Sequence, residues 1–151
     1  MNVGNLCERH ITTIGPRDDL TVAARLMREK HIGYLVVVEP EPGTNALRPI
    51  GVLTDRDIVV SVVAKNADPK ALLATDVMSM QPITIGDADP VDKALQTLRR
   101  TGVRRLPVVG SRGELVGVLS LDDLLDYVSG EIQNLSAAVR NERQIEGVLR
   151  P

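Results

Sequence analysis

The chain contains the same pattern twice, and this internal repeat constrains its fold more than any other feature. The tripeptide Thr-Ile-Gly at residues 13–15 returns at residues 84–86, 71 positions later. The run Ile-Gly-Val-Leu-Thr-Asp-Arg-Asp-Ile at residues 50–58 is matched by Val-Gly-Val-Leu-Ser-Leu-Asp-Asp-Leu at residues 116–124, now 66 positions later. The offset changes within residues 39–49, a proline-rich stretch of the kind that forms surface loops and varies in length. The sequence therefore predicts two tandem copies of one supersecondary unit.

The length and composition favour a single shared core for the two copies. The chain has 151 residues, so each copy is a unit of about 60–70 residues, which is marginal as an independent domain. No Phe or Trp is present and only two Tyr, so the core must be aliphatic and the aromatic platforms that stack single-stranded nucleic acid are lacking. The net charge of −2 gives no basic footprint for DNA or an anionic membrane. We expect function to reside where the two copies meet.

The single cysteine and the hydropathy pattern narrow the protein class further. Cys7 alone excludes an internal disulfide and a cysteine-based metal cluster, and we interpret it as a small apolar residue on a short helix. No apolar run approaches the roughly 20 residues of a membrane span. Charged residues interrupt the N-terminal region, which is unlike a signal peptide. We therefore expect a cytoplasmic protein.

Both copies predict the same order of elements: short strand, helix, strand, strand, helix, with a short lead-in helix before them. In copy one, spanning 3–64, the strands are expected at 12–14, 35–38 and 50–53, and the helices at 19–30 and from Thr54 to about residue 64. Copy two spans 74–128, with strands at 106–109 and 115–119. Asp18 and Asp89 are expected to cap the first helix of each copy, with Pro90 at the first helical position. Gly33 and Gly102 should end these helices.

Beyond residue 128 the pattern predicts an amphipathic C-terminal helix and tail, spanning 129–151. Val128, Ile132, Leu135 and Val139 have the spacing of one helical face. The helix should either fold back on the domain or pack on a partner, and its last residues should fray.

Each copy ends in a Thr/Ser-x-x-Asp motif, which allows two interpretations. Thr54 with Asp57, and Ser120 with Asp123, have the spacing of a helix capping box. A carboxylate at a helix start beside an open cleft can also accept hydrogen bonds from a ribose diol, as in dinucleotide-binding folds. The two roles are compatible, and the motif alone leaves both open.

The duplicated phrases closely resemble a tandem pair of cystathionine-β-synthase (CBS) domains. Three segments carry the resemblance: Gly-Val-Leu-Thr-Asp-Arg-Asp-Ile at 51–58, Gly-Val-Arg-Arg-Leu-Pro-Val-Val at 102–109 and Gly-Val-Leu-Ser-Leu-Asp-Asp-Leu at 117–124. The resemblance implies a mixed α/β (α+β) fold in which each repeat forms a small three-stranded sheet with two helices. It further implies pseudo-twofold packing of the repeats, two clefts between them, and a disk-shaped homodimer.

The resemblance also implies a stand-alone regulatory module that binds an adenosyl ligand, namely AMP, ADP, ATP or S-adenosylmethionine. Cleft one would use Thr54 and Asp57, with Thr13, Ile14, Tyr34, Val36 and Arg56. Cleft two would use Ser120 and Asp123, with Thr84, Ile85, Arg104, Arg105 and Pro107. Arg104 and Arg105 match the position that family members direct at phosphates, and a pair of solvated arginines is the competing interpretation. Because repeat one has Gly33 and Tyr34 at these positions, the second cleft is expected to bind the more anionic ligand.

Other functions find less support in the sequence. No nucleophile–base set, metal-ligand spacing or phosphate-binding glycine loop is present, so no catalytic residues, cofactor or metal site are predicted. The first alternative is an interaction scaffold with empty clefts that regulates a partner protein, in which both Asp motifs act only as caps. A small nucleotide-converting enzyme is the second alternative, and a nucleic-acid-binding protein ranks behind it.

Overall fold

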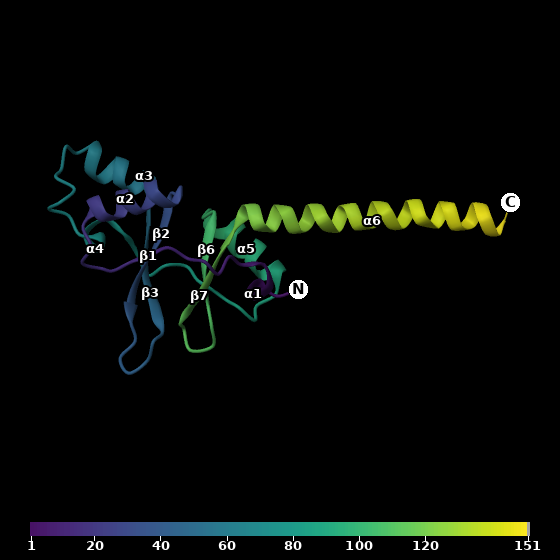
Figure 1. Ribbon diagram of the computed structural model, residues 1–151, viewed down its shortest axis with the longest axis horizontal. Coiled ribbons are helices and arrows are strands. Elements are labelled where there is room, and N and C mark those ends of the chain that lie inside the picture. Colours follow the sequence, from purple (N-terminus) through teal and green to yellow (C-terminus); the bar gives the residue numbers. More distant parts are fainter. Residues whose placement is uncertain (151) are drawn as a thin grey trace.

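The structure is a computed structural model that describes residues 1–150. Figure 1 shows a two-lobed body from which one long helix projects. The mixed α/β fold expected from the sequence is confirmed, and the two lobes contain one sheet each.

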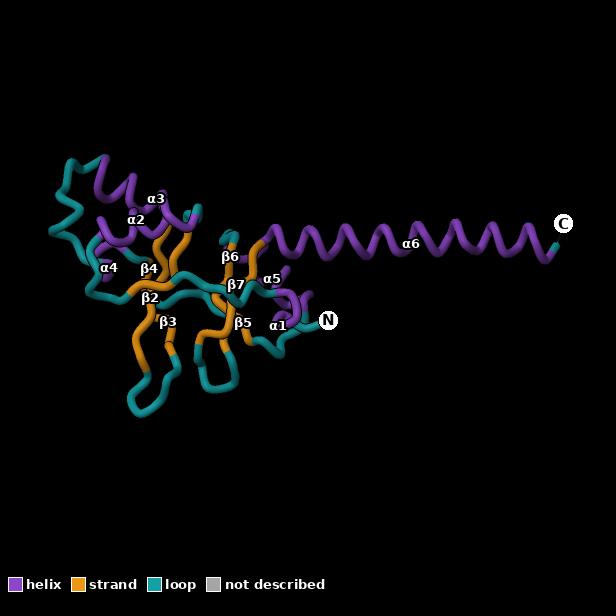
Figure 2. The backbone as a smooth tube through the Cα atoms, viewed as in Figure 1, coloured by secondary structure: helices purple, strands orange, loops and turns teal. Residues whose placement is uncertain are grey.

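The first sheet has four strands in the order β1-β2-β3-β4: Thr13–Ile14, Tyr34–Pro40, Leu47–Thr54 and Ser79–Met80. The second has three, β5-β6-β7: Ile85–Gly86, Arg105–Val109 and Leu115–Ser120. In each sheet the short first strand runs parallel to the next. The next two strands form an antiparallel hairpin, and both hairpins point to the bottom of Figure 2. The expected three strands are therefore extended by β4 in the first sheet. Its counterpart in the second sheet is a single bridge between Glu8 and Val118.

Helices cover one face of each sheet. The first lobe has α2 (Leu20–Lys30) and α3 (Asp55–Ile58), which continues as the π-helix η1 (Val59–Val63). The second lobe has α5 (Val91–Thr101) and the start of α6 (Leu121–Leu149). Helix α6 begins after its N-cap Ser120 and continues through Gly130 without a break for 29 residues, so the predicted C-terminal helix is the continuation of this helix.

The two predicted aspartate caps are wrong in a consistent way. Asp19, not Asp18, caps α2, and its carboxylate accepts the Thr21 and Val22 amides. Asp18 instead accepts the amide N–H of Gly15 at 2.8 Å. Asp89 makes the equivalent bond to Gly86 at 2.9 Å. These carboxylates fix the turn between short strand and helix, because that turn leaves a backbone donor without another partner.

The helix ends also differ slightly from expectation. Pro90 is the N-cap of α5 rather than its first helical residue. Helix α2 ends at His31, which adopts the left-handed conformation with φ 55°, whereas Gly102 ends α5 as expected, with φ 72°. Gly33 has a different role, because a Cβ there would overlap the carboxylate of Asp55.

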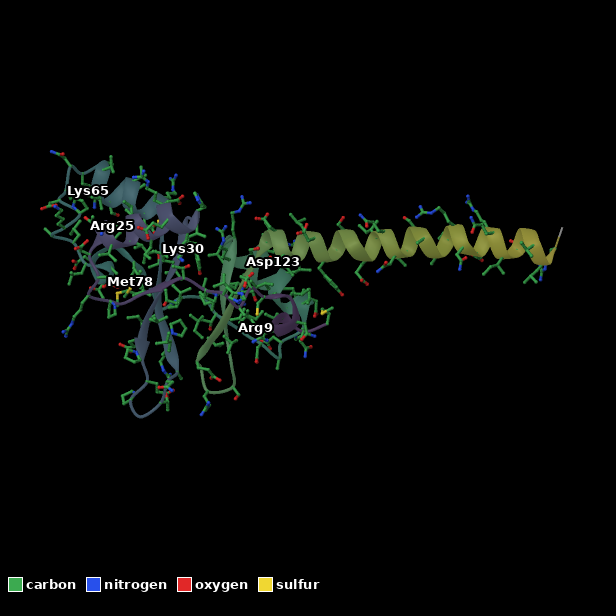
Figure 3. The ribbon with its side chains drawn as sticks, viewed as in Figure 1. Arg9, Arg25, Lys30, Lys65, Met78 and Asp123 are labelled. Atoms are coloured by element: carbon green, nitrogen blue, oxygen red, sulfur yellow. The ribbon has the colours of Figure 1, made fainter. Side chains whose placement is uncertain are left out.

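The lead-in helices are exchanged between the lobes. Helix α1 (Val3–Leu6) precedes repeat one, yet Val3 and Cys7 pack in the core of the second lobe. Helix α4 (Ala74–Val77) precedes repeat two, yet Ala74 packs in the core of the first. In Figure 1 the N-terminus and α1 accordingly lie beside α5, and in Figure 3 Met78 lies in the lobe of repeat one.

Equivalent backbone hydrogen bonds fix this exchange. The Val3 amide donates to the Asp89 carbonyl at 2.9 Å, and the Ala74 amide donates to the Asp18 carbonyl at 2.8 Å. Glu8 and Val118 exchange two backbone hydrogen bonds of 2.9 Å. Each lobe therefore completes its core and its sheet with a segment from the start of the other repeat.

Two glycines make room for the exchanged segments. A Cβ on Gly117 would overlap Sγ of Cys7 and lie 3.0 Å from the Glu8 carbonyl oxygen. A Cβ on Gly51, its repeat equivalent, would overlap Sδ of Met78. Close packing therefore explains why both repeats have glycine at the start of the Gly-Val-Leu phrase, because close-packed interiors have no free volume for an added methyl group.

We expect Gly117→Ala to lower the free energy of unfolding by about 1–3 kcal/mol, the usual cost of overpacking. Chemical denaturation of the full chain measures this change. Adding Cys7→Ala should cost less in the Gly117→Ala background than in wild type, because the two changes share one contact. Gly130→Ala is the control, because nothing lies within 4 Å of a Cβ at that position. A Gly117→Ala variant as stable as wild type would contradict the packing argument.

Candidate functional site

Two clefts lie between the repeats, one beside each Thr/Ser-x-x-Asp motif. The Asp57 cleft has a volume of about 440 Å³, and the Asp123 cleft about 350 Å³. Each volume lies within the range of roughly 300–1,000 Å³ typical of small-ligand sites. Figure 3 shows Asp123 at the base of α6, close to where the two lobes meet.

The motifs form the capping boxes predicted from their spacing. Thr54 Oγ1 accepts the Asp57 amide at 3.1 Å, and Asp57 Oδ2 accepts the Thr54 amide at 2.8 Å. Ser120 and Asp123 make the same two bonds at 3.1 and 2.7 Å, and the Ser120 hydroxyl also donates to Asp123 Oδ2. The capping interpretation is therefore confirmed for both motifs.

Capping uses only one of the two oxygen atoms of each aspartate carboxylate. The hydrogen bonds of both aspartates use Oδ2, and within residues 1–150 no donor bonds Oδ1 of Asp57 or of Asp123. The cap holds each side chain in place while its second oxygen stays available to a ligand in the cleft. Capping and ribose binding are thus geometrically compatible.

The structure groups the other site residues differently from the sequence-based assignment. Arg104, Arg105 and Pro107, assigned to the cleft of Asp123, line the cleft of Asp57. Of these three, only Arg105 also reaches the Asp123 cleft. The reason is that each cleft combines the motif of one repeat with the β-strand entry of the other, as pseudo-twofold packing requires. The expectation that the Asp123 cleft is the more cationic one is therefore wrong.

Tyr34 and Arg105 form a wall shared by both clefts. They occupy equivalent positions in the two repeats, at the starts of β2 and β6, and each lines both clefts. The Arg105 guanidinium carbon lies 5.7 Å from the centre of the Tyr34 ring, a cation–π distance. A ligand in either cleft would therefore touch the same pair.

The Tyr34 hydroxyl is buried without a hydrogen-bond partner in the described chain. Burial raises the pKa of the phenol well above its usual value, and Arg105 offsets only part of this rise. Leaving a buried hydroxyl unpaired costs free energy, so a ligand atom that pairs with it would gain that amount.

The two clefts differ in which charge predominates: arginines outnumber carboxylates in the Asp57 cleft, and carboxylates outnumber arginines in the Asp123 cleft. Three arginines line the Asp57 cleft (Arg56, Arg104 and Arg105), against the carboxylates of Asp55 and Asp57. The Asp123 cleft has one arginine, Arg105, against the carboxylates of Glu8 and Asp123, together with two histidines, His10 and His31. The backbone and side chain of His10 lower the pKa of Glu8 by hydrogen bonding to its carboxylate, which favours the charged form.

Several predicted residues do not face a cleft. The side chains of Ile14, Ile85 and Val36 are buried, the two isoleucines in the hydrophobic cores. Thr13 is half-buried on β1 and Thr84 is exposed, and neither lines a cleft.

The adjacent residues line the clefts instead. Ile11 and Thr12 line the Asp123 cleft, and their repeat equivalents Pro82 and Ile83 line the Asp57 cleft. The sequence-based assignment therefore chose residues one or two positions too far along the chain, and it assigned this segment of each repeat to the wrong cleft. Strand alternation was the signal available, because the side chains of Ile14 and Ile85 must enter the core.

Among residues 1–150, no three His, Cys, Asp or Glu side chains are grouped so that they could hold a metal ion. No helix in that range is long and apolar enough to span a bilayer.

Comparisons with known proteins agree with the architecture. The family profile of the CBS domain matches residues 3–64 and 74–130. A Pyrobaculum aerophilum CBS domain protein, PAE2072, solved in complex with AMP, is similar in structure with a TM-score of 0.71. It is 31% identical, and the match covers 82% of this chain and 90% of that one.

Among relatives in sequence, an uncharacterized protein of Methanopyrus kandleri, MK0525, is 34% identical over 125 residues, which is 83% of this chain. Inosine-5'-monophosphate dehydrogenase of Korarchaeum cryptofilum is 32% identical over 116 residues, or 77% of this chain. The chain spans 61% of the former protein and 22% of the latter.

Proposed function

The chain belongs to the CBS domain family, and we propose that it is a regulatory module that binds adenine nucleotides between its two repeats. One observation carries the proposal. The Asp57 cleft combines a carboxylate oxygen that can accept from a ribose with three arginines that can meet a phosphate. The AMP complex of the related Pyrobaculum aerophilum protein supports the same ligand class.

The Asp57 cleft is the proposed site for a phosphorylated ligand such as AMP, ADP or ATP. Asp57 would accept hydrogen bonds from the ribose through Oδ1. The guanidinium groups of Arg104 and Arg105 would bind the phosphates, and charge-assisted bonds of this kind are among the stronger polar contacts. Pro82, Ile83 and Val103 supply apolar surface for the base.

The Asp123 cleft is proposed to bind an adenosyl group with little or no negative charge. The carboxylates of Glu8 and Asp123 outnumber its single arginine and disfavour phosphates. S-Adenosylmethionine, whose sulfonium is cationic, is therefore the better candidate here. Because Arg105 is shared, a phosphate bound beside Asp57 would also withdraw that guanidinium from the second cleft.

Regulation would follow because a bound ligand changes the populations of the possible arrangements of the two repeats. A ligand that contacts both repeats favours the arrangement it fits best, and the population shifts accordingly. The regulated partner protein, the homodimeric state and the cytoplasmic location stay predictions. So does the alternative of an interaction scaffold with empty clefts, which the complete capping boxes would also permit.

A ligand screen separates these two functions. Specific binding raises the midpoint of thermal unfolding as ligand concentration exceeds Kd. AMP, ADP, ATP and S-adenosylmethionine should be compared by thermal unfolding and calorimetry. No shift with any of the four would favour the scaffold.

We expect Asp57→Asn to weaken AMP binding by about 1.5–3 kcal/mol, the scale of a hydrogen bond to a charged group. Isothermal titration calorimetry measures this change. Without ligand, stability should fall by about 1 kcal/mol or less, the value of a cap. Asp126→Asn is the matched control, because Asp126 is exposed on α6 and lines neither cleft. Unchanged AMP affinity in a folded Asp57→Asn variant would reject the ribose role.

Replacing both Arg104 and Arg105 with Ala should reduce AMP affinity far more than adenosine affinity, because adenosine has no phosphate. The salt dependence of AMP binding should also decrease, since fewer charges are screened. Arg99→Ala with Arg100→Ala is the matched control, as it removes two adjacent arginines from α5, outside both clefts. Equal losses for AMP and adenosine would show that the arginines do not bind phosphate.

A further inference from the structure

Helix α6 carries an apolar stripe that no other part of residues 1–150 covers. Every residue from Glu131 to Arg150 is exposed, and Figures 1 and 2 show the helix projecting from the body. The exposed fractions of Ile132, Leu135 and Val139 are 59%, 69% and 50%. The sequence-based alternative that this helix folds back on its own domain is therefore wrong.

A helix in this position needs packing that the body does not provide. Its 29 residues extend about 43 Å at 1.5 Å per residue. Only its first turns, through Leu121, Leu124 and Tyr127, contact the core of the second lobe. Most helical stability in proteins comes from packing an apolar face, so the projecting part lacks its main source of stability.

The spacing of the stripe identifies the kind of partner. The apolar positions 125, 128, 132, 135 and 139 alternate in steps of three and four, which is the heptad pattern of a helix that packs along another helix. A flat or globular surface imposes no such strict alternation. The narrow stripe therefore favours a second helix as the partner.

We propose that α6 pairs with α6 of a second copy of this chain as an antiparallel coiled coil. In this register Ile132 lies opposite Leu135 of the second copy, and Val128 lies opposite Val139. Four aliphatic layers form the centre of the contact.

The charges select a second copy and the antiparallel direction. A parallel pair would place Glu142 against Glu142 and Glu146 against Glu146, since these residues continue the same stripe. The antiparallel register brings Asp122 of one copy beside Arg143 of the other, twice by symmetry. It also places the two globular bodies at opposite ends. Charges that flank a coiled-coil seam set partner choice and orientation in this way.

A second apolar surface offers a different contact between copies. Val59, Val60 and Val63 on η1 are 55%, 48% and 69% exposed. This patch lies on the body, in the first lobe, whereas α6 packs on the core of the second lobe. Variants there and on α6 therefore distinguish the two interfaces. The pairing of α6 does not depend on nucleotide binding.

Sedimentation velocity of the full chain tests the stripe. Ile132→Arg with Leu135→Arg should halve the assembly mass relative to wild type at the same micromolar concentration. Gln133→Arg with Ala137→Arg adds the same charge on the opposite side of α6 and should leave the mass unchanged. The proposal is overturned if wild type is monomeric at every concentration, if the stripe variant keeps the wild-type mass, or if Val63→Arg alone dissociates the assembly.

Charge reversal tests the register and direction. Asp122→Arg and Arg143→Asp should each weaken self-association, and the double variant should restore it. Residues 122 and 143 are about 31 Å apart along one helix, so rescue can arise only between two chains. Failure of the double variant to recover, with circular dichroism showing an intact helix, overturns the antiparallel register.

Discussion

The exchange of the two lead-in segments is the contact on which the rest of this structure depends. Each lobe lacks part of its core and one edge of its sheet until the segment from the other repeat fills them. These segments pack so closely on β3 and β7 that a Cβ at Gly51 or Gly117 would overlap the sulfur of Met78 or Cys7. The single shared core expected from the chain length is therefore wrong: each lobe has its own hydrophobic core, and each core includes a segment from the start of the other repeat. Units of about 60–70 residues are marginal alone, and this exchange supplies the missing packing.

The same exchange creates the clefts. Because the repeats pack about a pseudo-twofold axis, the motif of one faces the strand entry of the other. Equivalent residues then meet at the axis, where Tyr34 from one repeat contacts Arg105 from the other. Sequence divergence at these few positions makes the two clefts unequal in charge while the backbone frame stays the same.

Capping and recognition share the same aspartates for a physical reason. A carboxylate at a helix start is held by backbone amides and favoured by the helix dipole. The cap bonds hold the side chain through one oxygen and leave the other without a hydrogen bond from the described chain, at the edge of the cleft that each aspartate lines. The motif would therefore persist as a stability element in a repeat that had lost its ligand, so its presence alone does not decide whether a cleft is filled.

Much of the fold could be predicted from the sequence, because the helices and strands depend mainly on patterns of neighbouring residues. Periodicity located the main helices and strands, and the Thr54 and Ser120 caps were readable from spacing alone. The sequence also determined which residues recur at equivalent positions, and so which pairs differ, such as Tyr34 and Arg105. The resemblance to the CBS family, carried by the same residues, placed the duplicated motif at clefts between the repeats.

Only the tertiary structure decided which repeat supplies each wall of a cleft. Arg104 and Asp57 are 47 positions apart in sequence, and no local pattern specifies that they face one cleft. The sequence likewise left α1 and α4 with their own repeats and left the direction of α6 open. These outcomes depend on packing between segments remote in the chain, whereas local patterns record only what neighbouring residues impose on one another.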